Sequence, residues 1–133
     1  MKKFICIGLI LTIILSFVGC GEKNYTFKDN IENITGVEIV FAKNSSDYSV
    51  EKSLSDSEIK KFLEMFKTIE FKTYYFGDPM SVGGNAVKIN YISGDYEMIC
   101  YHWAEYIKDG EIYPIRKSCD EKEFNNLLNA FMS

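Results

Sequence analysis

Two kinds of side chain in this sequence could carry acid–base chemistry: a single histidine and a few carboxylates. His102 is the only histidine, and imidazole is the side chain whose ordinary pKa lies closest to neutrality. No serine or cysteine motif supplies a nucleophile for it, and a histidine within a predicted strand is more often packed or solvated than catalytic. Glu97 and Glu105 are the alternative, because they could form an acid/base pair if the sheet brought them face to face.

Metal and cofactor chemistry is disfavoured by the same residues. One histidine and two cysteines beyond the N-terminal segment do not make a zinc ligand set. The acidic pairs Asp56 with Glu58 and Asp120 with Glu121 stand where helices are predicted to begin, and carboxylates there stabilise the helix dipole. We therefore expect no catalytic residue, no metal and no cofactor.

The residues that favour binding are aromatic side chains of the predicted sheet and one loop. Tyrosine and tryptophan combine a large contact area with a polar tip, which suits an interface, although both are also good strand formers. The loop Gly77–Gly84 resembles functional loops and ordinary long connections alike, and it lacks the lysine of a phosphate-binding loop. The candidate binding residues are Tyr74, Tyr75, Asp78, Met80, Tyr101, Trp103 and Tyr106.

The first twenty residues have the pattern of an export signal. Lys2 and Lys3 precede an apolar stretch, 4–18, that is shorter than the ~20 residues of a membrane-spanning helix. Phe17-Val18-Gly19-Cys20 resembles the lipobox of bacterial lipoproteins. The resemblance implies that 1–19 is a cleaved signal peptide. It also implies that Cys20 carries fatty acyl chains such as palmitate and anchors the chain to the outer face of the cell membrane.

Charge and length constrain the chain beyond the signal. The 15 basic residues fall to 13 without Lys2 and Lys3, against 19 acidic ones, so the mature chain has a formal charge of −6. An acidic chain without a basic stripe disfavours nucleic-acid binding and attachment to anionic headgroups. Residues 20–33 contain the lipidated cysteine and a polar tether whose far end could join the fold, and 34–133 are enough for one domain.

Periodicity predicts the elements of that domain. Alternation over 37–41 predicts a strand, and 48–54 a weaker returning one. Ser55 and Glu58 have capping-box spacing before a helix, and Ser118 and Glu121 repeat it before a second helix. A strand is predicted over 69–76. Three further strands, 87–91, 96–106 and 111–117, predict a meander with turns at Ser93-Gly94-Asp95 and Asp109-Gly110. The fold class is thus α+β, with two amphipathic helices on one face of a mostly antiparallel sheet.

Hairpin register predicts a disulfide between Cys100 and Cys119. With a two-residue turn at Asp109-Gly110, opposed residues have numbers that sum to 219, as those of the two cysteines do. An exported protein meets an oxidising compartment, which favours the bond.

Two functions remain open. The first is a non-enzymatic binding or inhibitor-like module that contacts a protein, peptide or glycan of the envelope. The second is an envelope hydrolase or its accessory, acting through an acidic pair or His102. At the family level, the domain is similar in length, signal and composition to the small uncharacterised lipoproteins of Gram-positive bacteria, which implies no activity.

Overall fold

A computed structural model describes residues 25–74 and 83–132. The elements, in chain order, are η2 (Ile31–Asn33), β1 (Ile34–Ala42), β2 (Tyr48–Ser53), α2 (Asp56–Phe66), β3 (Lys72–Thr73), β4 (Gly84–Tyr91), β5 (Tyr96–Ile99), β6 (Ala104–Lys108), β7 (Glu111–Ile115), β8 (Lys117–Ser118) and α3 (Glu121–Asn129). Within these ranges no helix is both long and apolar enough to cross a membrane.

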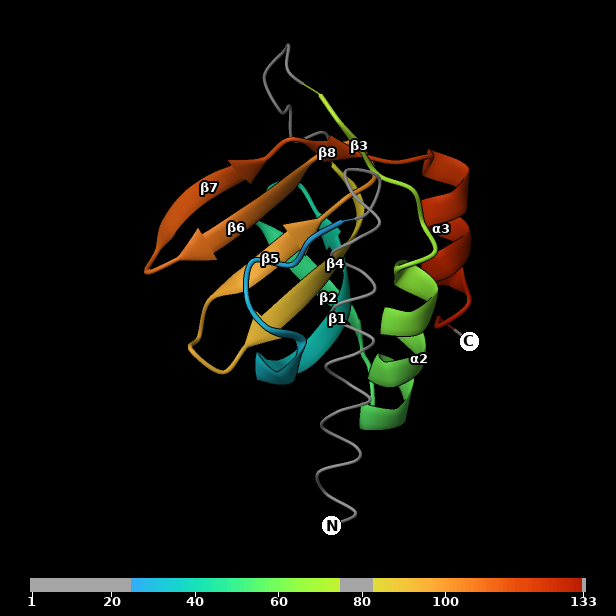
Figure 1. The fold of residues 1–133 in the computed structure, drawn as a ribbon, viewed down its shortest axis with the longest axis horizontal. Helices are drawn as coiled ribbons and strands as arrows, with labels where there is room; N and C mark the ends of the chain where they lie inside the picture. Colours follow the sequence, from blue (N-terminus) through green and yellow to red (C-terminus); the bar gives the residue numbers. More distant parts are fainter. Residues whose placement is uncertain (1–24, 75–82, 133) are drawn as a thin grey trace.

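Six strands form one sheet in the order β2-β1-β4-β5-β6-β7, and every neighbouring pair is antiparallel. The α+β class, the antiparallel sheet and the C-terminal meander are therefore confirmed (Figure 1). Asp109 and Gly110 both have positive φ, 52° and 80°, as a two-residue hairpin turn requires. Lys108 consequently pairs with Glu111, in the register expected from the sequence.

Two predicted strands differ in extent from those of the structure. The segment 96–106 is not one strand, because a turn over 100–103 divides it into β5 and β6, with the Cys100 amide donating to the Trp103 carbonyl at 2.8 Å. The described part of 69–76 is extended only at β3, which pairs with β8 in a separate two-stranded ribbon.

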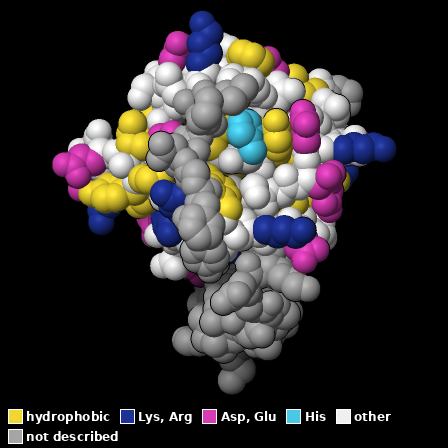
Figure 2. Space-filling view, turned by 90° about the horizontal axis from the view of Figure 1, so that it is seen from above, with side chains coloured by type: hydrophobic (Ala, Val, Ile, Leu, Met, Phe, Trp, Pro, Cys, Tyr) yellow, Lys and Arg dark blue, Asp and Glu magenta, His cyan; other side chains and the backbone are white. Residues whose placement is uncertain are grey.

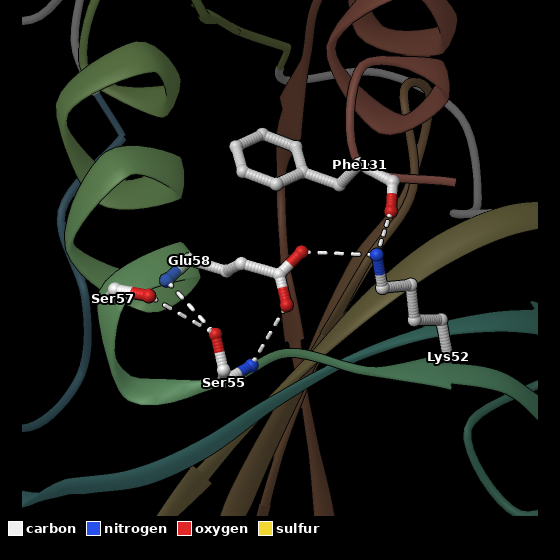
Figure 3. Close-up of polar contacts among 5 residues, drawn as sticks. All are labelled: Lys52, Ser55, Ser57, Glu58 and Phe131. Atoms are coloured by element: carbon white, nitrogen blue, oxygen red, sulfur yellow. Dashed lines mark hydrogen bonds and ion pairs between the residues drawn. The ribbon is translucent and has the colours of Figure 1, made fainter. Parts of the chain in front are cut away.

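Helices α2 and α3 lie side by side against one face of the sheet, here called the first face (Figure 1). The core beneath them contains Val37, Ile39, Phe62, Phe66, Phe71, Val87, Ile89, Ile99, Phe124, Leu127 and Leu128. Helix α2 begins with the predicted capping box: the Glu58 amide donates to Ser55 Oγ at 3.3 Å and the Ser55 amide to Glu58 Oε1 at 3.1 Å (Figure 3). Lys52 connects β2 to α2 and to the residues that follow α3, because its ammonium lies 2.9 Å from Glu58 and donates to the Phe131 carbonyl.

The cap of α3 is a correction to the sequence-based prediction. The cap is Asp120, whose carboxylate accepts from the Glu123 amide at 3.0 Å, while Ser118 belongs to β8. Pairing of Ser118 with Lys72 keeps it extended, which is incompatible with a helix starting there.

Residues 25–33, here called the strap, are the far end of the predicted tether and pack against the fold. The strap crosses in front of β4 and β5 (blue in Figure 1) and covers the part of the first face that the helices leave. Tyr25 and Phe27 pack on Phe66 with ring centroids 5.6 and 5.5 Å apart. The strap is the far end of the predicted tether, and it packs on the domain predicted over 34–133.

The opposite side of the sheet, the second face, has a smaller core of its own. It consists of Val40, Ala42, Ala86, Met98, Cys100 and Trp103, all 0% exposed. The β1–β2 loop, 43–47, folds over this face: Ser45 is 1% exposed, its hydroxyl donates to Glu105 at 2.7 Å, and its carbonyl accepts from the Tyr96 hydroxyl at 2.9 Å.

Candidate functional site

Several of the residues that could bind a ligand or react, among them His102, lie at one end of the sheet, at the top of Figure 1. The turn 100–103, the β3–β8 ribbon and the start of α3 meet there. The Cys119 amide donates to the Tyr101 carbonyl at 2.7 Å, and the Tyr74 amide donates to the Arg116 carbonyl at 3.2 Å. These bonds hold three chain segments, distant in sequence, as one surface, here called the ribbon end.

The structure places some of the predicted binding residues at the ribbon end and others elsewhere. Tyr74 and Tyr101 are half-buried there. Tyr106 lies on the first face instead, where its ring contacts Tyr91 and Tyr113 at 6.4 and 6.5 Å. The remaining predicted positions, Tyr75, Asp78 and Met80, lie outside the described residues.

Trp103 is fully buried and does not belong to an exposed aromatic surface. The turn 100–103 folds its indole into the core of the second face with Met98 and Cys100. A single long strand through 106 would have presented it with Tyr101. The turn is what separates the buried tryptophan from the half-exposed tyrosine.

His102 lies at the surface of the ribbon end, and the space-filling view from above shows the imidazole among hydrophobic and acidic side chains (Figure 2). Its Nδ1 is 3.8 Å from Cys100 Sγ. Burial lowers the pKa of His102, and the charge of Glu121 only partly opposes this shift, so the ring is neutral at pH 7.

The Cys100–His102 contact does not have the properties of a nucleophile with its base. Burial raises the pKa of Cys100, its side chain is 0% exposed, and its thiol donates to the Asn85 carbonyl at 3.3 Å. Reactive cysteines are partly exposed and have lowered pKa values. The thiol therefore acts as a packed core group.

Two polar atoms at the ribbon end are buried without a hydrogen-bonding partner among the described residues: Tyr74 Oη and His102 Nε2. Burial raises the pKa of Tyr74, and Arg116 lies 6.0 Å from its ring centroid. A hollow of about 340 Å³ opens nearby, between the ribbon and the start of α3. It is lined by Glu70, Lys72, Ser118, Cys119, Asp120 and Glu123.

The two cysteines of the domain are free thiols in the structure, in contrast to the predicted disulfide. The predicted hairpin register continues as far as Ala104, which pairs with Ile115. Cys100 lies outside this register, because β6 begins at Ala104. Cys100 joins the core of the second face, whereas Cys119 packs against the core of the first.

Glu97 and Glu105 cannot act as a pair, because they lie on opposite faces of the sheet. Glu97 pairs with Tyr106, and Glu105 pairs with Met98. Glu105 accepts from Ser45 on the second face, and Glu97 accepts from Tyr25 on the first. The sequence offered a signal for the burial of Glu97: it shares the parity of Ile99 in a strand that is apolar on both sides.

Lys88 is the centre of a polar cluster on the second face that sequence reasoning did not find. Its ammonium lies 4.9 and 4.5 Å from the ring centroids of Tyr48 and Tyr96, and it donates to the Tyr48 hydroxyl at 2.8 Å. Glu38 is 3.8 Å away and accepts from Asn90 at 2.6 Å. The cation is satisfied by these partners, which points to a structural role.

In residues 25–74 and 83–132, no group of three or more His, Cys, Asp or Glu side chains could hold a metal ion. Comparison with known proteins gives no match to any family model, curated protein sequence or solved structure. The folded domain is thus not assigned to any characterised family.

Proposed function

We propose that this chain is a lipid-anchored protein of the bacterial cell envelope that binds a protein, peptide or glycan without catalysing a reaction, and that the ligand contacts the ribbon end. The anchor is Cys20, on the strength of the lipobox-like residues that precede it.

One observation favours this surface: of the three buried side-chain polar atoms without a hydrogen-bonding partner among the described residues, Tyr74 Oη and His102 Nε2 lie here, whereas Tyr91 Oη lies in the core of the first face. A buried polar group without a partner costs ~1–3 kcal/mol, which a ligand recovers when it supplies the missing donor or acceptor. Tyr101 adds half-exposed aromatic area at the same end, as interfaces favour. The hollow beside α3 adds polar side chains within the same surface.

A hydrolytic role finds no comparable support. Glu97 and Glu105 face away from each other across the sheet, and the thiol of Cys100, which contacts His102, is inaccessible. Binding is therefore the function that this geometry favours.

Site-specific photo-crosslinking in cells tests the proposal. A photoreactive residue replaces Tyr101 at the ribbon end or, as the matched control, the exposed Lys60 on α2. We expect a discrete crosslinked product from position 101 that is absent from position 60 and weakened by His102→Ala. Crosslinking from position 60 alone, or a product unaffected by His102→Ala, would contradict the proposed surface.

The anchor is tested separately by Cys20→Ala. We expect the parent protein in the membrane fraction with a diacylglyceryl mass on a chain that starts at Cys20, and the variant without that modification. A Cys20→Ala protein that is still lipidated would refute the anchoring site.

A further inference from the structure

The strap is held by one buried carboxylate. Glu97, in the middle of the sheet on β5, is 0% exposed. Both of its oxygens accept hydrogen bonds from the strap: Oε2 from the Tyr25 hydroxyl at 3.0 Å, and Oε1 from the Lys28 amide. The donors are a neutral hydroxyl and a backbone amide, so these bonds do not neutralise the carboxylate charge.

The surroundings of Glu97 are mostly apolar or neutral. Tyr25 stacks edge-on against Phe71, with centroids 5.1 Å apart, and against Phe66 of α2. Among residues 25–74 and 83–132, the ionisable neighbours are Tyr25, Lys28 and Asp29 of the strap, Tyr91 of β4, Asp95 of the β4–β5 turn and Tyr106 of β6. Burial raises the pKa of Tyr25, Tyr91 and Tyr106, so these three phenols stay neutral between pH 5 and 8.

We propose that Glu97 is a pH-sensitive latch, and that the strap docks on the sheet more firmly at acidic than at alkaline pH. Opening of the strap removes both hydrogen bonds and the aromatic cover from Glu97 and exposes the carboxylate to water. The ionised carboxylate gains most from that exposure, because burial penalises charge. Ionisation therefore favours the open strap.

The direction and the size of the pH dependence of strap opening follow from the linkage between proton binding and opening. Burial raises the pKa of Glu97 to about 7 with the strap closed, although its hydrogen bonds lower it in part. A solvated glutamate has a pKa near ~4.3. The closed state thus binds a proton that the open state releases, and the opening constant rises on the order of 70-fold between pH 5 and pH 8.

Opening of the strap changes how far the domain can lie from Cys20, the proposed membrane anchor. The strap joins β1 directly to the segment that follows Cys20. Nine residues in extended form span roughly 30 Å, at ~3.3 Å each. On the proposed anchoring at Cys20, an alkaline shift would let the domain stand further from the membrane.

Hydrogen exchange of the full mature protein, purified from membranes in detergent, tests the latch. Protection factors, corrected for intrinsic exchange at each pH, are compared between the strap and β4. We expect the protection factors of the strap amides to fall by a factor of several tens from pH 5 to pH 8 in the parent protein, and by far less in Glu97→Gln. Glu105→Gln, which alters a carboxylate on the opposite face, is the matched control and should behave like the parent.

Three outcomes would overturn the proposal. If the protection factors of the strap in the parent protein do not change with pH, Glu97 is not a pH-sensitive latch, whatever the variants show. Strap and β4 amides that lose protection in step show that the strap does not open as a separate unit. A Glu97→Gln protein with the same pH dependence as the parent assigns the titration to another group.

Discussion

The Ser45–Glu105 hydrogen bond should stabilise the whole domain, although it joins a loop to a strand on the face without helices. Ser45 is 1% exposed, and its hydroxyl donates to Glu105 Oε2 at 2.7 Å, a short bond to a carboxylate. Bonds of this kind contribute ~1.5–3 kcal/mol, more than neutral ones, because the donor stabilises a charge. We therefore expect Ser45→Ala to lower the free energy of unfolding by about 2 kcal/mol.

The assay is urea unfolding at pH 7, followed by far-UV circular dichroism, on the parent protein and four variants. Ser46→Ala is the control, because Ser46 is the exposed neighbour in the same loop and surface substitutions stay within ~0.5 kcal/mol. Ser45→Ala, Glu105→Gln and the double variant complete a thermodynamic cycle. We expect a coupling energy of about 1 kcal/mol, since glutamine still accepts a hydrogen bond but carries no charge.

Two results would refute this reasoning. Equal stability of Ser45→Ala and Ser46→Ala would mean that the loop does not depend on the buried hydroxyl. Zero coupling between Ser45 and Glu105 would mean that any loss arises from the cavity left by the hydroxyl. The Tyr96 bond to the Ser45 carbonyl survives in Ser45→Ala, so the loop keeps one attachment in the variant.

Three further predictions concern other parts of the domain. Burial raises the pKa of Glu97 to about 7, so its stabilising contribution is complete below about pH 4.5 and is lost as pH rises through 7. In urea unfolding, the free energy of unfolding of Glu97→Gln relative to that of the parent should therefore rise by about 2.5 kcal/mol from pH 5 to pH 8. A difference between the two proteins that stays constant over this range would contradict the prediction. Burial raises the pKa of Cys119 to about 12 and also raises that of Cys100, so an aromatic disulfide reagent at pH 8 should label the native mature protein slowly. In guanidinium without reductant, the same reagent should label two thiols per chain rapidly, whereas the absence of any labelled thiol would indicate a disulfide. Asp120→Ala removes the α3 cap and should lower the free energy of unfolding by about 1 kcal/mol, while Ser118→Ala should lower it much less. If Ser118→Ala were the less stable of the two variants in thermal unfolding, Ser118 and not Asp120 would be the cap.

Local patterns in the sequence predicted the elements whose causes are themselves local. The capping box of Ser55 and Glu58 and the Asp109-Gly110 turn depend on residues within four positions of each other, and both are confirmed. The amphipathic helix predicted after this capping box is α2, and its Phe62 and Phe66 are buried against the sheet.

The features that sequence reasoning missed depend on contacts between distant segments. The turn at 100–103 contains neither glycine nor proline, so nothing local interrupted the predicted strand. Burial of Trp103 also depends on the second core, to which β1 and β4 contribute. The sequence allowed the far end of the tether to join the fold, but where the strap packs depends on its contacts with Glu97 and Phe66, about 70 and 40 residues away along the chain.

The position of Trp103 gives the molecule a built-in optical reporter. It is the only tryptophan, it is fully buried, and it lies on the face opposite the helices and the strap. Its emission should be blue-shifted in the native protein and should respond to detachment of the 43–47 loop, while circular dichroism follows the sheet and helices as a whole. Comparing the two signals during unfolding would therefore show whether the two cores, separated only by the thickness of one sheet, melt together or in turn.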